Sequence, residues 1–262
     1  MRRLPFKETC FVAFEFASAR EATSSAASEN ILSLKAFQAE YDFSLEAICA
    51  RMLDRHRDTI RTQKPHIAVT KLARIIRTTL MLSNRKGFHS MSLRELAKVS
   101  GLSMGALYTY FDSKDTLLMM ILGEVSSAVS TALGCPPASL ADDPVRRLRW
   151  LLETHVYLTE TMQPWFLFAY MEAKAFSKEG REKARRSELA TEAMIADALA
   201  DVVRRKQASV PNVELTAALI KPLLQDWYVK RGKYRRRGVT PEQYVEAVAG
   251  FVQGAISLRR GA

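Results

Sequence analysis

The stretch that decides the fold runs from Ser92 to Lys114 and reads SLRELAKVSGLSMGALYTYFDSK. Ser92 and Glu95 have the spacing of a capping box, in which two side chains satisfy amides at the start of a helix. Gly101 stands where the chain must reverse, because glycine adopts a positive φ at little cost. Ser103 can cap a second helix. The stretch therefore predicts a helix-turn-helix, whose second helix enters the major groove of DNA.

The outward side of the second predicted helix is polar or small, and it carries no charge. Its residues are Ser103, Met104, Gly105, Ala106, Tyr108, Thr109 and Tyr110. A surface of this kind can press against base edges without burying a carboxylate beside them. Helix–turn–helix segments also occur in all-α proteins that bind no nucleic acid, so it is the composition of this side that favours DNA.

A longer segment, residues 70–118, resembles the N-terminal domain of the TetR family of transcriptional regulators. The matching motifs are Gly87-Phe88, Ser92-Leu93-Arg94-Glu95-Leu96-Ala97, Gly101-Leu102-Ser103, Gly105-Ala106-Leu107-Tyr108 and Tyr110-Phe111-x-Ser113-Lys114-Asp115-x-Leu117-Leu118. Ala106 stands where the family often has Thr, and Tyr110 stands where His is common. The resemblance implies an all-α, TetR-like fold: a three-helix DNA-binding domain joined to a larger helical domain for ligand binding and dimerisation.

Each candidate DNA-binding residue has an expected role. The residues expected to contact phosphates and to set the register on the duplex are Ser92, Ser103, Tyr108, Tyr110 and Lys114. Arg94 is expected to form a two-pronged contact with guanine. Met104, Ala106 and Thr109 are expected to touch base edges, including thymine methyl groups, and Gly105 lies among them.

Charge and length suggest how the chain is divided. Lys and Arg number 39 against 28 Asp and Glu, a formal net charge of +11. Residues 66–115 carry eight basic and three acidic side chains, the highest charge density in the chain, which favours double-stranded DNA as partner. We predict a partly helical N-terminal extension at residues 1–65, the DNA-binding domain at 66–118, and a helical ligand-binding and dimerisation domain at 119–262.

The extension lies outside the family resemblance. Ser18–Asn30 predicts a flexible or weakly helical joint, and Phe43–Thr62 repeats apolar residues at helical spacing, which predicts a helix packed on the body. The alternative is a basic arm for DNA, formed by Arg51, Arg55, Arg57, Arg61 and Lys64. Asp54 and Asp58 alternate with these residues, which favours a solvated charged face.

The first residues superficially imitate a secretory signal, with Arg2-Arg3 before an apolar run at Cys10–Phe14. Lys7, Glu8 and Glu15 interrupt the stretch, and the run of five residues is shorter than the roughly seven that a signal requires. No apolar run approaches the length of a membrane span. We therefore expect a cytoplasmic protein with no membrane partner.

Cysteines and histidines are sparse and scattered. They are Cys10, Cys49, Cys135, His56, His66, His89 and His155. Their spacing predicts reduced thiols and neither a disulfide framework nor a metal site. The rival interpretation is an enzyme, but the sequence lacks GxSxG, Walker, HExxH and dinucleotide-binding motifs. We expect a protein that is not an enzyme and that has no cofactor.

Aromatic and Met residues are concentrated in the middle of the chain and can line a pocket for a small hydrophobic effector. The candidates are Trp150, Tyr157, Met162, Trp165, Phe168, Met171 and Trp227. The alternative is that these residues are ordinary core. The basic run Lys230–Arg237 is typical of a solvated helix end, and it can alternatively hold the phosphates of an acyl-coenzyme A type ligand.

The last two long helical patterns are where the family resemblance implies a dimer interface. The candidate interface residues are Leu224, Tyr228, Tyr244, Val248, Phe251 and Val252. Thr240 and Gln243 form a second capping-box pattern at the start of the last helix. The alternative is a monomer that buries both helices in its own core, but a palindromic operator needs two reading heads about one helical turn apart.

The resulting hypothesis is a ligand-responsive regulator of transcription, a repressor that binds a palindromic operator as a dimer and is released by a small hydrophobic effector. The alternative is an architectural or protein-interaction module that binds DNA without any effector. Binding that ignores DNA sequence would favour the alternative.

Overall fold

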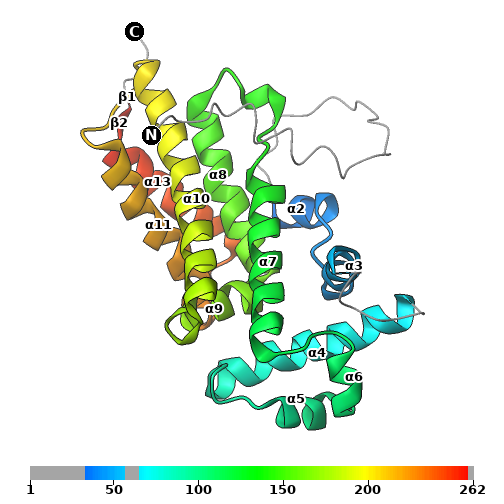
Figure 1. Cartoon of the computed structure of the whole chain (residues 1–262). Coiled ribbons are helices and arrows are strands. Elements are labelled where there is room, and N and C mark those ends of the chain that lie inside the picture. Colours follow the sequence, from blue (N-terminus) through cyan, green and yellow to red (C-terminus); the bar gives the residue numbers. More distant parts are fainter. Residues whose placement is uncertain (1–32, 57–64, 259–262) are drawn as a thin grey trace.

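The computed structural model describes residues 33–56 and 65–258 of the 262-residue chain. Helices α4–α6 form one end of the molecule, and the helices of the body lie above them (Figure 1). In chain order the elements are α2 (Leu34–Glu40), α3 (Leu45–Arg55), α4 (Pro65–Lys86), α5 (Leu93–Ser100), α6 (Met104–Tyr108), α7 (Lys114–Leu133), η1 (Ala138–Leu140), α8 (Pro144–Thr161), α9 (Gln163–Met171), η2 (Ala173–Ala175), α10 (Lys178–Arg204), β1 (Ala208–Ser209), α11 (Val213–Val229), α12 (Arg231–Arg236), α13 (Pro241–Ala255) and β2 (Ser257–Leu258). The predicted all-α architecture, with a three-helix N-terminal unit and a larger helical body, is confirmed.

Local sequence signals set the bounds of the DNA-binding helices. Gly87 ends α4 at a φ of +85°, and Gly101 ends α5 at a φ of +65°, both in the left-handed region that favours glycine. The Ser92 hydroxyl accepts from the amide of Glu95, and the Ser103 hydroxyl accepts from the amide of Ala106, at 3.1 Å each. The predicted helix-turn-helix is therefore present, with both helix starts capped by side chains.

A shared core holds these three helices together. Its fully or almost fully buried side chains are Leu72, Ile75, Ile76, Phe88, Met91, Leu96, Ala97, Leu107 and Phe111. Helix α4 packs along α5, and α5 packs on α6. Because α6 has only five residues, its position depends on this packing and not on its own helical stability.

Helix α7 connects the DNA-binding end to the body. It packs against α3, α8, α9 and α10, and it crosses the boundary that the sequence predicts between residues 118 and 119. Contrary to the expectation from the sequence, α7 is long and apolar enough to cross a membrane, but 61% of its apolar window is buried within the protein. Its contacts are those of a core helix.

The body is built from α8, α10, α11 and α13 packed on α7 and α9. The predicted capping box opens α13: the Thr240 hydroxyl accepts from the Gln243 amide, and the Gln243 side chain accepts from the Thr240 amide. Sequence reasoning found no strands, but two residues of β1 pair antiparallel with two of β2, joining the end of α10 to the end of α13.

The described part of the N-terminal extension packs on both parts of the molecule. Helix α2 lies on α8, and α3 lies on α4 and α7. The Leu34 amide donates to Glu242 of α13 at 3.2 Å, and Arg55 pairs with the buried carboxylate of Glu124 in α7. The helix expected in Phe43–Thr62 is therefore present as α3, whereas Ser18–Asn30 and the distal part of the basic arm lie outside the described residues.

Candidate nucleic-acid interface

The outward surface of α6 is accessible. Ser103, Gly105 and Thr109 are exposed, and 53% of Tyr108 is exposed. Met104 and Ala106 are half-buried and lie between these exposed positions; Met104 also packs against the core. These six residues form one short strip that the rest of the described structure leaves uncovered. We call this strip the α6 surface; it consists of Ser103, Met104, Gly105, Ala106, Tyr108 and Thr109.

Hydroxyl groups on this surface also organise the backbone. Thr109 Oγ1, at the end of α6, donates to the carbonyl of Ala106 at 2.7 Å. The Ser103 hydroxyl caps the start of the same helix. Each hydroxyl oxygen keeps a lone pair or proton that can face a phosphate or a base. These hydrogen bonds to the backbone orient both hydroxyl groups before DNA binds.

Two exposed cations of α5, Arg94 and Lys98, lie beside the helix-turn-helix. Neither makes a hydrogen bond or ion pair through its side chain with another described residue. The third charged residue of α5, Glu95, is paired with Lys86 of α4, and this pairing lowers the pKa of the carboxyl group. Arg94 and Lys98 are therefore available to DNA, and the nearby carboxylate is neutralised within the protein.

Two predicted phosphate contacts are placed differently by the structure. Tyr110 is only 3% exposed, and burial raises its pKa, so its ring is part of the core and not of the α6 surface. Lys114 Nζ donates to the carbonyls of His89 and Met91 at 2.7 and 2.9 Å and lies 4.8 Å from the centre of the Phe88 ring. Its ammonium group is thus held by the loop between α4 and α5.

Arg74 of α4 is not among the residues singled out from the sequence. The structure shows its guanidinium donating to the carbonyls of Ser100 and, at 3.3 Å, Gly101. These carbonyls lie at the end of α5, where a cation is favoured. Arg74 therefore fastens the turn of the helix-turn-helix to α4. The signal in the sequence was weak, because an arginine on a helix face is usually solvated.

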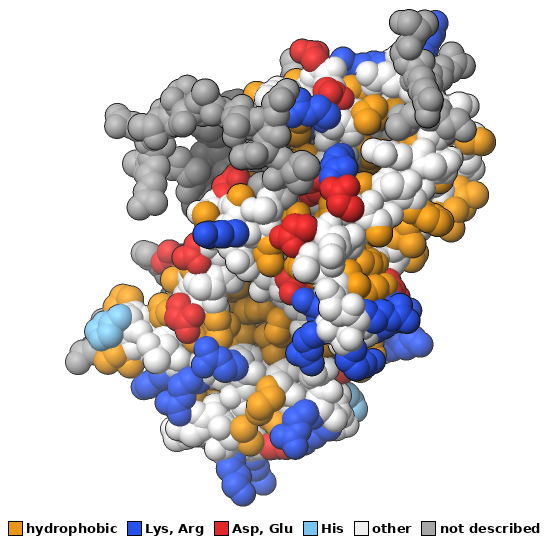
Figure 2. All heavy atoms as spheres, turned by 180° about the vertical axis from the view of Figure 1, so that it is seen from behind, with side chains coloured by type: hydrophobic (Ala, Val, Ile, Leu, Met, Phe, Trp, Pro, Cys, Tyr) orange, Lys and Arg blue, Asp and Glu red, His pale blue; other side chains and the backbone are white. Residues whose placement is uncertain are grey.

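Basic side chains gather over the DNA-binding end of the molecule, and a hollow lined by hydrophobic side chains lies above it (Figure 2). A groove of about 610 Å³ is lined by residues of α3, α4 and α9. Three of the predicted pocket residues, Trp165, Phe168 and Met171, line this groove. They face the DNA-binding end and not the inside of the body.

The contact between the two parts of the molecule is centred on Phe88. Its ring meets the ring of Phe168 edge-on at 5.4 Å, and its amide donates to the carboxylate of Glu172 at 2.8 Å. Glu172 follows α9 directly, and Phe88 follows α4. These two contacts therefore join α9 to the loop that leads into the helix-turn-helix.

The other predicted pocket residues do not form one site. Tyr157 and Trp227 are fully buried, and Met162 lines a smaller cavity of about 210 Å³ beside α2 and α3. Trp150 is half-buried and packs against the core. Tyr157 and Trp227 are thus ordinary core, because aromatic spacing alone cannot distinguish a packed interior from a cavity wall.

A different cavity lies inside the body. It has a volume of about 410 Å³ and is lined by α7, α9, α10 and α11. Its apolar wall includes Leu122, Val125, Val129 and Phe166, and Lys221 of α11 also lines it. Sequence reasoning missed Lys221. The signal was present: Ala217, Lys221, Leu224 and Tyr228 have helical spacing, which places the lysine on the buried side of α11.

A second and larger cavity, of about 910 Å³, lies toward the far end of α10. Its charged side chains include Arg147 and Asp201, which pair with each other. Its lining carries more acidic than basic side chains, since Glu192, Asp197 and Glu214 stand beside this pair and Arg204. It therefore does not favour an anionic ligand.

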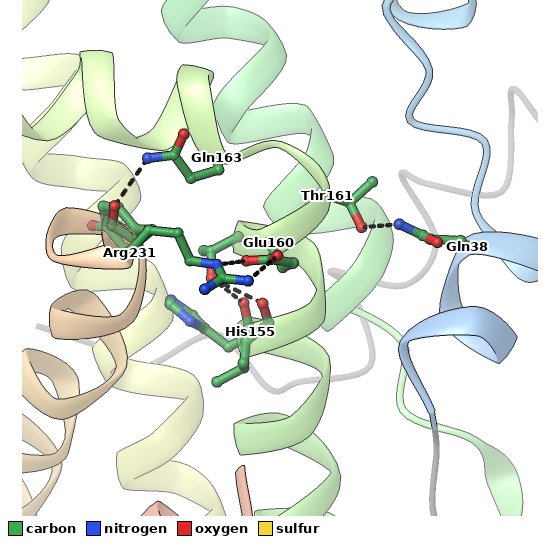
Figure 3. A network of polar contacts seen from close by, with 9 residues as sticks. Gln38, His155, Glu160, Thr161, Gln163 and Arg231 are labelled. Carbon is green, nitrogen blue, oxygen red and sulfur yellow. Dashed lines mark hydrogen bonds and ion pairs between the residues drawn. The ribbon is translucent and has the colours of Figure 1, made fainter. Parts of the chain in front are cut away.

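The first three basic residues of the run that follows α11 are used within the protein. Arg231 donates twice to Glu160 of α8, at 2.7 and 2.9 Å, and its guanidinium lies 4.4 Å from the ring centre of Trp227. Lys230 and Lys233 pair with Asp226. Figure 3 shows Arg231 reaching Glu160 close to Gln163 and His155. Arg235, Arg236 and Arg237 remain exposed.

The predicted dimer residues are mostly internal. Leu224, Tyr228, Tyr244, Val248 and Val252 are each 7% exposed or less. Phe251 is 68% exposed. Large apolar residues lie on both the buried and the exposed side of α11, and Phe251 lies on the otherwise polar or small exposed side of α13. The sequence therefore did not show which side packs on the body of the same chain. The outer face carries Leu215, Leu219 and Phe251, which are 56%, 64% and 68% exposed.

Among the described residues, no group of histidine, cysteine, aspartate and glutamate side chains has the arrangement of a metal site. Cys49 is buried in α3, and Cys135 is exposed after α7.

A capped helix pair with an accessible second helix, mounted on a helical body that contains a cavity, defines a helix-turn-helix DNA-binding regulator. Residues 75–119 match the family model described as bacterial regulatory proteins, tetR family. Residues 141–252 match the model of the tetracyclin repressor-like C-terminal domain. The chain belongs to the TetR family of transcriptional regulators. Because its relatives are regulators and not enzymes, the prediction that it is not an enzyme is confirmed.

The chain is also similar to individual proteins. It is 28% identical over 102 residues to the HTH-type transcriptional repressor KstR of Mycobacterium tuberculosis, covering 37% of this chain and 46% of that protein. A TetR-family regulator from Bordetella parapertussis has a TM-score of 0.59 at 18% identity, over 74% of this chain and 98% of that one. FadR from Bacillus subtilis, solved with stearoyl-CoA, has a TM-score of 0.53 at 14% identity, over 71% and 99%. The chain thus spans less than half the length of that KstR, and the solved structures support the fold.

Proposed function

We propose that this chain is a ligand-responsive repressor that binds a palindromic operator as a homodimer and is released by a small hydrophobic effector. The observation that carries the proposal is the accessible, uncharged α6 surface on a helix-turn-helix whose neighbouring carboxylate, Glu95, is paired internally with Lys86. Such a regulator acts on the chromosome in the cytoplasm.

In this proposal α6 enters the major groove and α5 lies across its edge. Arg94 forms the two-pronged contact with guanine, and Met104, Ala106 and Thr109 meet base edges. Gly105 lets the helix approach closely. Ser92, Ser103 and Tyr108 contact phosphates, together with Lys98 in place of Lys114 and Tyr110.

The dimer forms through the outer faces of α11 and α13. Leu219 and Phe251 are large, apolar and exposed, and a side chain added at Gly250 or Gly254 would meet nothing within 4 Å. Small residues beside large apolar ones let a second copy of the two helices approach closely. Dimerisation places two α6 helices at about 34–36 Å, the spacing of successive major grooves on one side of the duplex.

The effector acts through α9. This helix contributes Phe166, Ala169 and Tyr170 to the 410 Å³ cavity, and Phe168 with Glu172 connects it to Phe88. Each position of α9 corresponds to one separation of the two DNA-binding ends of the dimer. A ligand that fits only one position shifts the equilibrium toward that separation, by as much as its affinities for the two states differ.

The test is to select bound sequences from a pool of random duplexes and to measure the mass of the complex. We expect a palindromic consensus and two chains per duplex. Leu219→Asp should produce monomers and weaken operator binding at least tenfold, because it buries a charge in the interface. The matched control is Leu189→Asp on α10, which is 44% exposed and should leave both properties unchanged. Binding that ignores sequence would instead support an architectural module.

A further inference from the structure

The cavity between α7, α9, α10 and α11 combines an apolar wall with one buried cation, Lys221; the other charged side chains of its lining are Lys174, Arg181, Arg185 and Glu188. Its volume of about 410 Å³ lies in the range of small-molecule sites. The wall facing the cation is formed by α7 and α9, with Leu122, Val125, Val129 and Phe166. Lys221 lines the same cavity from α11 and is 7% exposed.

Lys221 is buried without a balancing negative charge. Its Nζ lies 3.1 Å from Nε2 of His155, also buried at 2% exposure. No carboxylate of the described residues lies within ion-pair distance of Nζ. An ammonium group in such surroundings is unfavourable unless an anion reaches it.

The groups that face Lys221 come from two neighbouring helices and its own. His155 of α8 is neutral, because burial and the neighbouring lysine lower its pKa. Glu188 and Glu192 of α10 act on Lys221 from a distance, and Glu188 is already engaged by Gln225 at 2.7 Å. Tyr228 is also protonated at neutral pH, because burial raises its pKa. None of these groups places a carboxylate against Nζ.

We propose that this cavity binds an apolar molecule carrying one carboxylate, and that the carboxylate pairs with Lys221 Nζ while the apolar part lies along α7 and α9. The proposal rests on the proposed function in one respect, since it gives the chemical class of the effector. A straight-chain fatty acid is the simplest molecule of this class.

Protonation makes the pairing dependent on pH. Burial lowers the pKa of Lys221 from 10.5 to about 8, so the ammonium form is the main one at pH 7 and the minor one above about pH 9. A carboxylate ligand prefers the ammonium form and should bind more weakly as the pH rises through 8. An uncharged ligand of the same length should show no such change.

The experiment is calorimetric titration of the full chain with straight-chain acids from hexanoate to hexadecanoate, each compared with its alcohol. At pH 7 we expect the best acid to bind at least tenfold more tightly than its alcohol. Raising the pH from 7 to 9.5 should weaken the acid about tenfold and leave the alcohol unchanged. Equal affinities of acid and alcohol, or no binding of any acid, would overturn the proposal.

Two variants assign the effect to Lys221. Lys221→Met should remove the preference for the acid and its pH dependence while retaining the alcohol. Lys183→Met is the matched control, because Lys183 is a half-buried lysine of α10 that donates to the Met119 carbonyl at 3.4 Å and lies outside this cavity. A preference for the acid over the alcohol that survives in Lys221→Met, or that disappears equally in Lys183→Met, would contradict the assignment. If Lys221→Met does not fold, the comparison of acid with alcohol in the native chain decides.

Operator binding is measured separately, by fluorescence anisotropy. Acids that bind the cavity without releasing DNA would refute the effector role and leave the binding site intact. A chain that ignores DNA would refute the proposed function and leave the carboxylate preference intact.

Discussion

Two lysines, one at the DNA-binding end and one in the body, are held in opposite ways. Lys114 donates to two backbone carbonyls and lies over the ring of Phe88. Lys221 meets only the uncharged ring of His155 and the wall of a cavity. In the first case the protein itself satisfies the cation and gains rigidity. In the second case the cation remains available, at a cost in stability that a ligand can remove.

The same contrast applies to the two parts as a whole. The DNA-binding end uses Arg74 and Lys114 to fasten its own loops, while Arg94, Lys98 and the α6 surface stay exposed for the proposed contacts with DNA. The body contains cavities instead of a closed interior. A rigid reading head and an adaptable body are the combination that a ligand-controlled regulator requires.

The largest effect is expected where the two parts meet. Phe88→Ala removes a ring that is 3% exposed and packs on Phe168, so it should lower the free energy of unfolding by about 3–5 kcal/mol. The measurement is denaturation with urea. Val99→Ala, at a side chain 48% exposed on α5, is the control and should change stability by less than about 0.5 kcal/mol. A similar loss in both variants would mean that Phe88 has no special place in the junction.

The next effect has the opposite sign. Lys221→Met should raise the free energy of unfolding at pH 7 by up to about 3 kcal/mol, because the pKa falls from 10.5 to about 8 on folding and each unit corresponds to about 1.4 kcal/mol. The folded pKa is the lower one, so the unfolded chain binds more protons between pH 8 and 10.5, and stability should rise with pH there. Below pH 8 the full penalty applies.

The difference between the native chain and Lys221→Met isolates this effect from tyrosine titration, which acts above about pH 10. We expect the difference to shrink by about 2 kcal/mol between pH 7 and 9.5. A difference that is constant with pH would show that Lys221 has the same pKa in the folded and the unfolded chain.

The same contrast explains which parts the sequence could predict. Caps and turns depend on residues three or four positions apart, so Ser92, Gly101 and Ser103 could be assigned from the sequence. The roles of Arg74 and Lys114 depend on contacts with carbonyls 23 to 27 residues away. Those contacts are fixed by how the helices pack, which spacing along one helix does not contain.

The body was harder to predict for a related reason. Trp227 and Tyr157 are aromatic residues of the core, whereas the cavity is lined by Lys221, Phe166 and Val125 among others, none of which is among the candidate pocket residues. Whether a buried apolar residue faces a neighbour or a cavity depends on how well distant helices fit together. For the same reason, five residues predicted for the dimer surface lie inside the chain, and Leu215 and Leu219 lie on its outside.

Specific recognition of DNA should depend on Arg94 more than on any other cation of α5. Arg94→Ala is expected to cost about 1–3 kcal/mol of binding free energy and to relax the preference at one base pair. Lys98→Ala, a change of the same charge on the same helix, should weaken all sequences equally. The measurement is competition binding with every single-base variant of the selected operator. Equal losses across all variants for Arg94→Ala would show that Arg94 only holds a phosphate.

The smallest effect tests whether Lys114 belongs to the protein or to DNA. Lys114→Met removes hydrogen bonds of 2.7 and 2.9 Å to the carbonyls of His89 and Met91, which should reduce stability by about 1–2 kcal/mol. Because the ammonium is already engaged by the loop, the salt dependence of operator binding should change less than in Lys98→Ala. A phosphate contact would instead lower the slope of log affinity against log salt by about one, as expected for one released counterion. If Lys114→Met leaves the stability unchanged and lowers the slope of log affinity against log salt, Lys114 contacts DNA. The contrast between a lysine satisfied by the protein and the available Lys221 would then be wrong.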